Sequence, residues 1–229
     1  STLYIAGTGL AIAMTVVMAV VYYVKLAPVY PEVNRANTLY LTSASFQSER
    51  QATQSGLSFQ ALQEWMYPLK NVVEVSAVID YGMETPAYIQ PADLSGDFSV
   101  ALKLVDPAFF RIYSFRFLEG NPFTDSDLAS AIHTAVISDD LARRLFGTTK
   151  DVVGRSFSLD YVNYRVCGVV RSASYLTPQS YAQVYLPYSV KEDYKQPFHQ
   201  KFPYCGEFSV TFLVKDKAQT DALRAEIRD

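Results

Sequence analysis

Histidine, serine and glycine motifs are the first places where this sequence could carry catalytic chemistry. The chain has two histidines. His133 precedes a short apolar run and His199 lies in a polar segment, so we interpret both as surface side chains. No serine lies in a G-x-S-x-G nucleophile motif, and Gly7-Thr8-Gly9 lacks the G-x-x-x-x-G-K-[ST] pattern that cradles phosphates. We therefore predict no catalytic residues and no enzymatic activity in this chain.

Two acidic pairs are of a type that could bind a cation. Asp125-x-Asp127 lacks the glycine and the glutamate of a calcium-binding loop. Asp139-Asp140 stands at the start of a predicted helix, where the helix dipole favours negative charge. We expect neither pair to hold a metal, and we predict no metal site and no cofactor.

The two cysteines, Cys167 and Cys205, are far apart and form no metal or redox motif. Cys167 lies within the apolar run 166–170, which favours a buried free thiol. An oxidising compartment would instead allow the two cysteines to pair. The sequence leaves both possibilities open.

The longest apolar stretch, Leu3–Val24, has no charged residue and is followed by Lys25. As a helix it would be about 33 Å long, enough to cross a hydrocarbon core of about 30 Å. Tyr4, Tyr22 and Tyr23 lie near its ends, as in an interfacial aromatic belt. We predict a transmembrane helix over residues 1–26, and weigh against it a signal peptide and a buried core helix.

The other residues have the composition of a folded extramembranous domain. The net charge of the whole chain is −3, and its lysines and arginines form no basic cluster. This balance argues against nucleic acid as a partner. Aromatic residues make up 14% of the chain and supply ample side chains for a core.

Local patterns predict an α+β domain after a proline-containing stem over 26–36. Helices are expected from Phe59 to Tyr67 with Ser58 as N-cap, after Ser138 with Gly147 as terminator, and over Lys217–Ile227 with a capping box from Asp216 and Gln219. We expect residues 43–56 to form a loop and 188–206 to be irregular. Strands are predicted at Leu39–Thr42, Val72–Tyr81, Phe98–Val105, Thr134–Ile137, Phe157–Leu159, Tyr164–Val170, Val184–Leu186 and Phe208–Val214.

Aromatic side chains interleave with prolines between Tyr175 and Tyr204. Such loops can form partner surfaces, or their rings can pack over a junction between subdomains. We favour packing over partner contact for this stretch, whose rings are Tyr175, Tyr181, Tyr185, Tyr188, Tyr194, Phe198, Phe202 and Tyr204.

An ordered series of short motifs resembles the periplasmic core domain of MacB-type ABC transporter permeases. The stem Pro31–Tyr40 is similar to the segment that follows the first membrane helix in many such permeases. The remaining motifs are Val105-Asp106-Pro107-Ala108-Phe109-Phe110, Gly120, Ala135-Val136-Ile137-Ser138, Leu141–Gly147, Val153-Gly154, Tyr164–Val170 and Val184-Tyr185-Leu186-Pro187.

The resemblance implies a split α/β porter-like subdomain, formed by 37–90 and 205–229, with a β-rich sabre-like insert over 91–204. Together they would form a periplasmic domain, 27–229, anchored in the bacterial inner membrane by the first helix.

The resemblance also implies a mechanical function. Cytoplasmic ATP hydrolysis, in a separate ATP-binding subunit or domain, would move this domain for the export or extraction of substrates. Implied partners are the membrane, that subunit, a second permease copy and a periplasmic adaptor. The alternatives are the extracytoplasmic sensor domain of a membrane receptor and, more weakly, a membrane-anchored hydrolase.

Overall fold

The structure is a computed structural model that describes residues 12–22, 27–47, 52–91, 96–198 and 201–228. Its helices are 12–22, α2 (Phe59–Ala61), which continues into the π-helical turn η2 (Leu62–Met66), α3 (Pro107–Ile112), α4 (Asp125–Ala129), α5 (Asp139–Phe146) and α6 (Lys217–Arg228), with 3-10 turns η1 (Arg35–Asn37) and η3 (Tyr188–Val190). The strands are β1 (Thr38–Leu41), β2 (Ala44–Gln47), β3 (Ala52–Leu57), β4 (Glu74–Gln90), β5 (Phe98–Val105), β6 (Phe117–Gly120), β7 (Thr134–Ser138), β8 (Ser156–Leu159), β9 (Val162–Val170), β10 (Val184–Pro187), β11 (Cys205–Gly206) and β12 (Ser209–Leu213).

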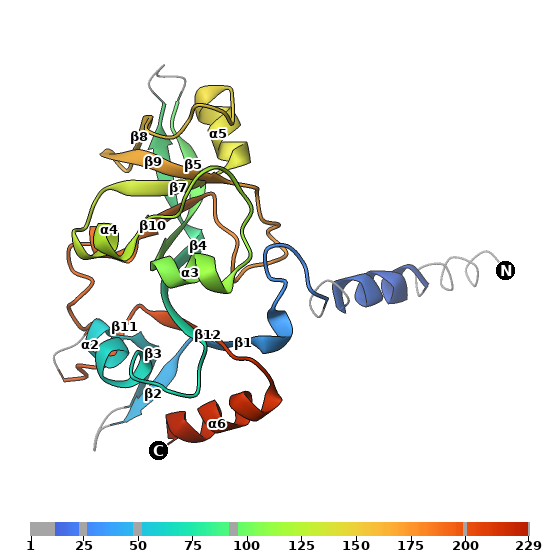
Figure 1. The fold of residues 1–229 in the computed structure, drawn as a ribbon, viewed down its shortest axis with the longest axis vertical. Coiled ribbons are helices and arrows are strands. Elements are labelled where there is room, and N and C mark those ends of the chain that lie inside the picture. Colours follow the sequence, from blue (N-terminus) through green and yellow to red (C-terminus); the bar gives the residue numbers. More distant parts are fainter. Residues whose placement is uncertain (1–11, 23–26, 48–51, 92–95, 199–200, 229) are drawn as a thin grey trace.

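Six strands of the larger sheet close into a small barrel. The pairing runs β4-β5-β10-β7-β9-β8 and returns to β4, because β8 pairs with both β9 and β4. The β5–β10 and β7–β9 pairs are parallel and the other pairs of this ring are antiparallel. Closure leaves the ring without free strand edges, and the barrel occupies the upper half of the molecule in Figure 1. The α+β prediction is confirmed, but the barrel was not foreseen.

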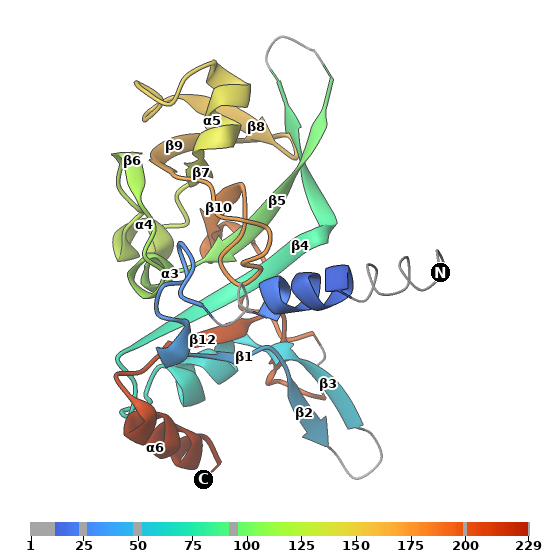
Figure 2. The same ribbon diagram turned by 90° about the vertical axis from the view of Figure 1, so that its right-hand side faces the viewer.

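The first half of β4 belongs to an open sheet below the barrel. There β12 lies between β1 and β4, with antiparallel pairing on both sides. A second sheet of β11, β3 and β2 lies beside it, and α6 flanks the lower end of the molecule in Figures 1 and 2. The long strand β4 therefore runs through both halves, and its register with β5 shifts on each side of Gly82.

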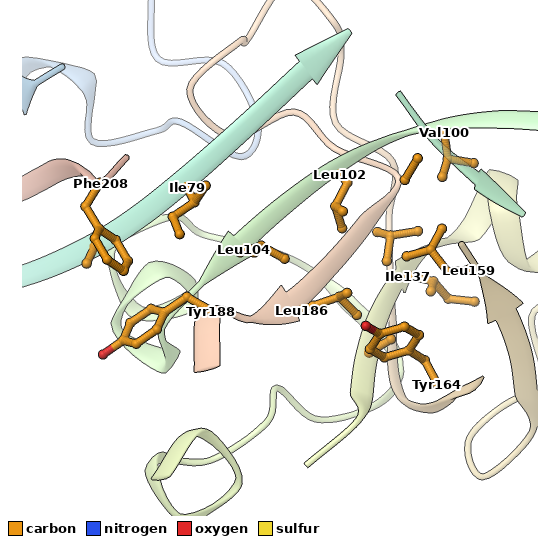
Figure 3. Packing of buried hydrophobic residues seen from close by; sticks show 14 of the residues in the cluster. Ile79, Val100, Leu102, Leu104, Ile137, Leu159, Tyr164, Leu186, Tyr188 and Phe208 are labelled. Atoms are coloured by element: carbon orange, nitrogen blue, oxygen red, sulfur yellow. The ribbon is translucent and has the colours of Figure 1, made fainter. Parts of the chain in front are cut away.

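Two groups of buried side chains stabilise this arrangement. The larger group fills the barrel interior and continues under the open sheet, and Figure 3 shows Leu102, Leu104 and Leu186 among its members. The smaller group packs Phe109 and Tyr185 on the outer face of the barrel. Each fully buried leucine or phenylalanine contributes about 1.5–3 kcal/mol relative to an exposed one.

The predicted helix boundaries are largely confirmed. Ser58 Oγ accepts from the Ala61 amide, and Ser138 Oγ accepts from the Leu141 amide, so both serines cap their helices. Gly147 ends α5 in the left-handed conformation, with φ of 71°. The predicted strands correspond to β1, β4, β5, β7, β8, β9, β10 and β12, with β4 extending nine residues past Tyr81.

One local prediction is wrong, and one helix was not predicted. Residues 43–56 contain strands β2 and β3, which pair antiparallel from Ala44↔Ser55 to Gln47↔Ala52. Their polar composition hid this hairpin, which contacts the core through only Ala44, Phe46 and Leu57 among its described apolar side chains and also pairs with the distant β11. Helix α3 at Pro107–Ile112 was not predicted; Asp106 caps it by accepting from the Phe109 amide.

The N-terminal helix over 12–22 projects from the side of the molecule (Figure 2). The side chains of these residues are exposed. The predicted membrane span, Leu3–Val24, lies partly outside the described residues. Within the ranges that the structure describes, no helix is both long and apolar enough to cross a membrane.

Candidate functional site

The stem, residues 27–37, connects the N-terminal helix to the domain and is the best candidate for a functional site. It runs along the junction between the barrel and the open sheet before entering β1 (Figures 1 and 2). A loop that is buried against the rest of a protein must pair its backbone N–H and C=O groups, because they have lost their contact with water. The stem's hydrogen bonds therefore identify which part of the domain holds it.

Tyr30 fastens the start of the stem to loops of the barrel. Its hydroxyl donates to the Arg171 carbonyl at 2.8 Å and accepts from the Arg116 amide at 3.2 Å. The Arg171 guanidinium lies 5.3 Å from the centre of the Tyr30 ring, within range of a cation–π interaction. Burial raises the pKa of the Tyr30 hydroxyl, so it stays a proton donor at neutral pH. The next residue, Pro31, accepts from the Ser114 amide at 3.0 Å.

Glu32 is the buried anchor of the stem, with only 3% of its side chain exposed. Its Oε1 accepts from the Ser180 amide at 3.0 Å and from the Ser180 hydroxyl at 2.8 Å. Its Oε2 accepts from Arg35 Nε at 2.7 Å. Both carboxylate oxygens are thus paired, as a buried charge requires. Glu32 and Ser180 are 148 positions apart, so this contact joins the stem to the segment that leads into β10.

The end of the stem belongs to the open sheet. The Asn37 carbonyl accepts from the Val214 amide at 2.9 Å, and the next residues form β1 beside β12. Thr38 also donates to the Asn34 carbonyl and closes the turn before the strand. A displacement of the stem would therefore act on the barrel through Tyr30 and Glu32, and on the open sheet through β1.

Charged groups on the outer face of the barrel extend this network. Lys103 of β5 is buried and pairs with Asp80 of β4. Burial lowers the pKa of Lys103, while Asp80 and, more weakly, Glu32 act in the opposite direction. The carboxylate of Glu32 thus contributes to the electrostatic environment of a buried cation in the central strands.

Asp106, at the end of β5, joins β4 to the start of α3. Its carboxylate accepts from Ser76 Oγ at 2.7 Å, from the Ala77 amide at 2.8 Å and from the Phe109 amide at 3.1 Å. Burial raises its pKa to about 6, although these hydrogen bonds favour the ionised form. The role of Asp106 is structural, because all three partners belong to the fold.

The acidic pairs take structural positions. Asp127 forms a capping box with Thr124 at the start of α4. Asp139 accepts from the Ser172 amide and hydroxyl and from Arg143. Burial opposes its ionisation, but these donors outweigh that effect and lower the pKa of Asp139. No cluster of three potential metal ligands occurs among the residues that the structure describes.

The remaining candidate residues do not converge on a site. His133 is exposed and lies 5.2 Å from the Tyr164 ring, whereas His199 lies outside the described residues. Cys167 and Cys205 are both free thiols. The aromatic segment divides: Tyr185 and Tyr188 are buried, while Tyr175 and Phe198 are 73% and 59% exposed.

Sequence reasoning did not identify Tyr30, Glu32 or Ser180. An acidic residue in a proline-containing stem usually faces water, and no local pattern marks a serine so far along the chain as its partner. The one readable signal was that Glu32 precedes Arg35 by three residues, a spacing that permits an ion pair.

Comparison with known proteins gives a family for the whole chain. A family model described as the MacB-like periplasmic core domain matches residues 1–229. The macrolide export ATP-binding/permease protein MacB of Shigella dysenteriae serotype 1 is 31% identical over 109 residues. That alignment covers 46% of this chain but 17% of the relative, so the chain spans a small part of that protein.

Solved structures share the fold at low sequence identity. A permease-protein domain from Porphyromonas gingivalis matches with a TM-score of 0.57 at 17% identity, covering 85% of this chain and 81% of that one. The periplasmic region of MacB from Actinobacillus actinomycetemcomitans gives 0.56 at 16% identity, covering 84% and 85%. The extracellular domain of the ABC-type transporter YknZ from Gram-positive bacteria gives 0.53 at 16% identity, covering 81% and 86%.

These findings confirm the resemblance seen in the sequence motifs and the prediction that the domain is not an enzyme. The chain belongs to the MacB-like periplasmic core domain family, the non-catalytic periplasmic or extracellular part of ABC transporter permeases.

Proposed function

We propose that this domain transmits movement from the membrane helices of an ABC permease to its periplasmic parts, and that the stem is the element through which force enters. ATP hydrolysis by a cytoplasmic subunit or domain would displace the helix before the stem. The displaced stem would then move the domain to export or extract a substrate on the periplasmic side.

The observation that carries this proposal is the double attachment of the stem. Tyr30, Pro31 and Glu32 bind loops of the barrel, and β1 continues directly into the open sheet. A buried, fully paired carboxylate resists displacement because moving it away would leave several donors without partners. Such an attachment is suited to carry force, whereas a solvated linker would dissipate it.

The proposal assigns the two halves of the fold to the subdomains inferred from the sequence. The open sheet, with 37–90 and 205–229, would be the porter-like subdomain. The barrel region, within 91–204, would be the sabre-like insert, and β4 is shared between them. A transmembrane helix over 1–26 would anchor the domain to the bacterial inner membrane.

The partners follow from the same proposal. An ATP-binding subunit or domain supplies the energy, a second permease copy or homologue completes the assembly, and a periplasmic adaptor receives the movement. The acidic balance of the chain and its lack of a basic sequence cluster disfavour nucleic acid as a partner.

The test is made on the full-length protein in native membranes. We expect an ATP-binding subunit or domain to co-purify with it, and deletion of residues 27–229 to abolish export while ATP hydrolysis persists. A full-length protein that has one further span followed by a signalling domain, and that binds no ATPase, would refute the proposal in favour of a receptor sensor domain.

A further inference from the structure

The long strand β4 has little support where it passes from the open sheet to the barrel. Its pairing with β12 ends at Val78, and its pairing with β8 begins at Ile89. Between these two positions, β5 is the only strand that pairs with it in the described part of the chain, and the β4–β5 register shifts on both sides of Gly82. Gly82 has a positive φ of 58°, and Figure 2 shows β4 changing direction on its way to the barrel. Because bulges bend a strand, this stretch of β4 is where the two halves of the fold can change their relative orientation.

An ion pair holds β4 at this bend. Lys103 of β5 pairs with Asp80 Oδ2, and Asp80 Oδ1 accepts from the Gly82 amide at 2.9 Å. In the described part of the chain, Asp80 is the only ion-pair partner of Lys103, which is 1% exposed. A buried ammonium group is costly unless it is paired. Lys103 therefore holds the Asp80 carboxylate in place, and that carboxylate holds the amide of the bulge.

The face of the barrel that carries Lys103 is covered by other segments of the chain. Leu102 and Leu104 belong to the group that fills the barrel, so Lys103 between them points to the outer face. Tyr185 lies beside Lys103 in register and is fully buried in the smaller group on that face. Burial lowers the pKa of Lys103, and the Glu32 carboxylate of the stem is among the groups that oppose this effect. The stem therefore lies within electrostatic range of this buried ammonium group.

Hydrogen bonds connect the cover of Lys103 to the anchor of the stem. The Tyr185 hydroxyl donates to the Ser180 carbonyl at 2.8 Å and accepts from the Ala182 amide at 3.1 Å. The amide and the hydroxyl of Ser180 in turn donate to Glu32. Glu32, Ser180, Tyr185 and Lys103 thus form a continuous series of buried groups from the stem to the ion pair at the bend.

We propose that Lys103 and Asp80 form a latch that fixes the bend of β4, and that the docked stem keeps this latch closed by excluding water from Lys103. Detachment of the stem admits water to the ammonium group and weakens its attraction to Asp80, because that attraction falls as the local dielectric constant rises. The released β4 changes its course at Gly82, and the barrel turns relative to the open sheet. This inference rests on the proposed function in that the stem is the element that the membrane helix moves.

The first measurement observes the Lys103 ammonium group directly. The full chain, in detergent micelles, carries 15N-labelled lysine, and the exchange of ammonium protons with water is followed by NMR. The signal of Lys103 is assigned by its absence from Lys103→Met. We expect Glu32→Ala to accelerate this exchange at least about tenfold, because a detached stem admits water. Glu192→Ala, at an exposed position, should leave it unchanged.

The second measurement observes the orientation of the two halves. Spin labels are introduced as non-natural amino acids at the exposed positions of Lys150, in the barrel region, and Arg224, in α6. Pulsed electron paramagnetic resonance then gives the distribution of distances between the labels. We expect a wider distribution in Lys103→Met, in which an uncharged side chain of similar length keeps the buried space filled. Lys217→Met makes the same change at an exposed position and is the matched control.

Two results would overturn the proposal. One is unchanged ammonium exchange at Lys103 in Glu32→Ala although exchange at the Ser180 amide has accelerated. The other is a distance distribution in Lys103→Met as narrow as that in Lys217→Met. If Lys103→Met does not fold, Asp80→Asn replaces it, since it removes the charge and keeps an oxygen for the amide of the bulge. Both measurements use the chain without its ATPase, so a loss of export bears on the proposed function and not on the latch.

Discussion

The strongest prediction concerns the buried carboxylate of Glu32. Replacing Glu32 by alanine removes the buried carboxylate that accepts from the Ser180 amide, the Ser180 hydroxyl and Arg35 Nε. Breaking a buried, hydrogen-bonded charge pair by removing one partner costs about 3–5 kcal/mol. The free energy that holds the stem against the barrel should fall by this amount.

Amide hydrogen exchange reports this docking directly. The Ser114 amide is bonded to Pro31 and the Ser180 amide to Glu32, so both are exposed when the stem detaches. A loss of about 3–5 kcal/mol in the opening free energy accelerates exchange at these two amides by at least about a hundredfold. Exchange in β7, which contacts neither group, should change far less.

Two variants make the result specific. Glu32→Gln keeps an oxygen for Ser180 but loses the charge that pairs with Arg35, so its effect should be intermediate. Glu192→Ala removes an exposed glutamate and should leave exchange at both amides unchanged. Unaltered exchange at Ser114 and Ser180 in Glu32→Ala would refute the idea that this carboxylate holds the stem.

Three further predictions concern the stability of the folded domain. Gly120→Ala should destabilise the domain by several kcal/mol, because the new Cβ would lie 2.1 Å from the Cys167 carbonyl oxygen. Gly147 has a similar φ but open space around it, so Gly147→Ala should cost only about 1–2 kcal/mol. Equal losses for the two variants in denaturant unfolding would contradict this. Asp106 has a raised pKa in the folded chain, so the unfolded chain loses this proton at lower pH. The contribution of Asp106 to the free energy of unfolding should therefore fall by about 3 kcal/mol as pH rises from 4 through 6. Denaturant unfolding of Asp106→Asn should lack this pH dependence. The pKa of Asp139 is lowered in the folded chain, so its ionised carboxylate stabilises the fold. The stability lost in Asp139→Asn should be largest above pH of about 4 and should vanish as pH falls through the folded pKa. A difference in unfolding free energy that does not vary with pH would be inconsistent with this.

Local signals predicted the elements whose stability is local. Ser58, Ser138 and Gly147 satisfy or terminate backbone hydrogen bonds within a few residues of themselves, so their neighbours suffice to place them. The start of α3 was readable in the same way, since Asp106 followed by Pro107 is an N-cap with proline in the first turn.

Elements held by distant partners could not be predicted. The hairpin β2–β3 is mostly polar, and its contacts with the core and with β11 come from segments far along the chain. The barrel closes through Ile89↔Leu159 and Gln90↔Ser158, residues about seventy positions apart. The anchoring of Glu32 by Ser180 is of the same kind, so the candidate site became visible only in three dimensions.

The measurement that tests the mechanical account most directly is made on the full-length permease with its ATPase in membranes. ATP hydrolysis and substrate export are compared for Glu32→Ala, Glu192→Ala and the unmodified protein. We expect Glu32→Ala to keep its ATP hydrolysis while its export falls at least about tenfold, because a docking loss of a few kcal/mol frees the stem from the barrel. Export that remains equal to that of Glu192→Ala, with the stem detached as judged by hydrogen exchange, would contradict the claim that the docked stem transmits the movement.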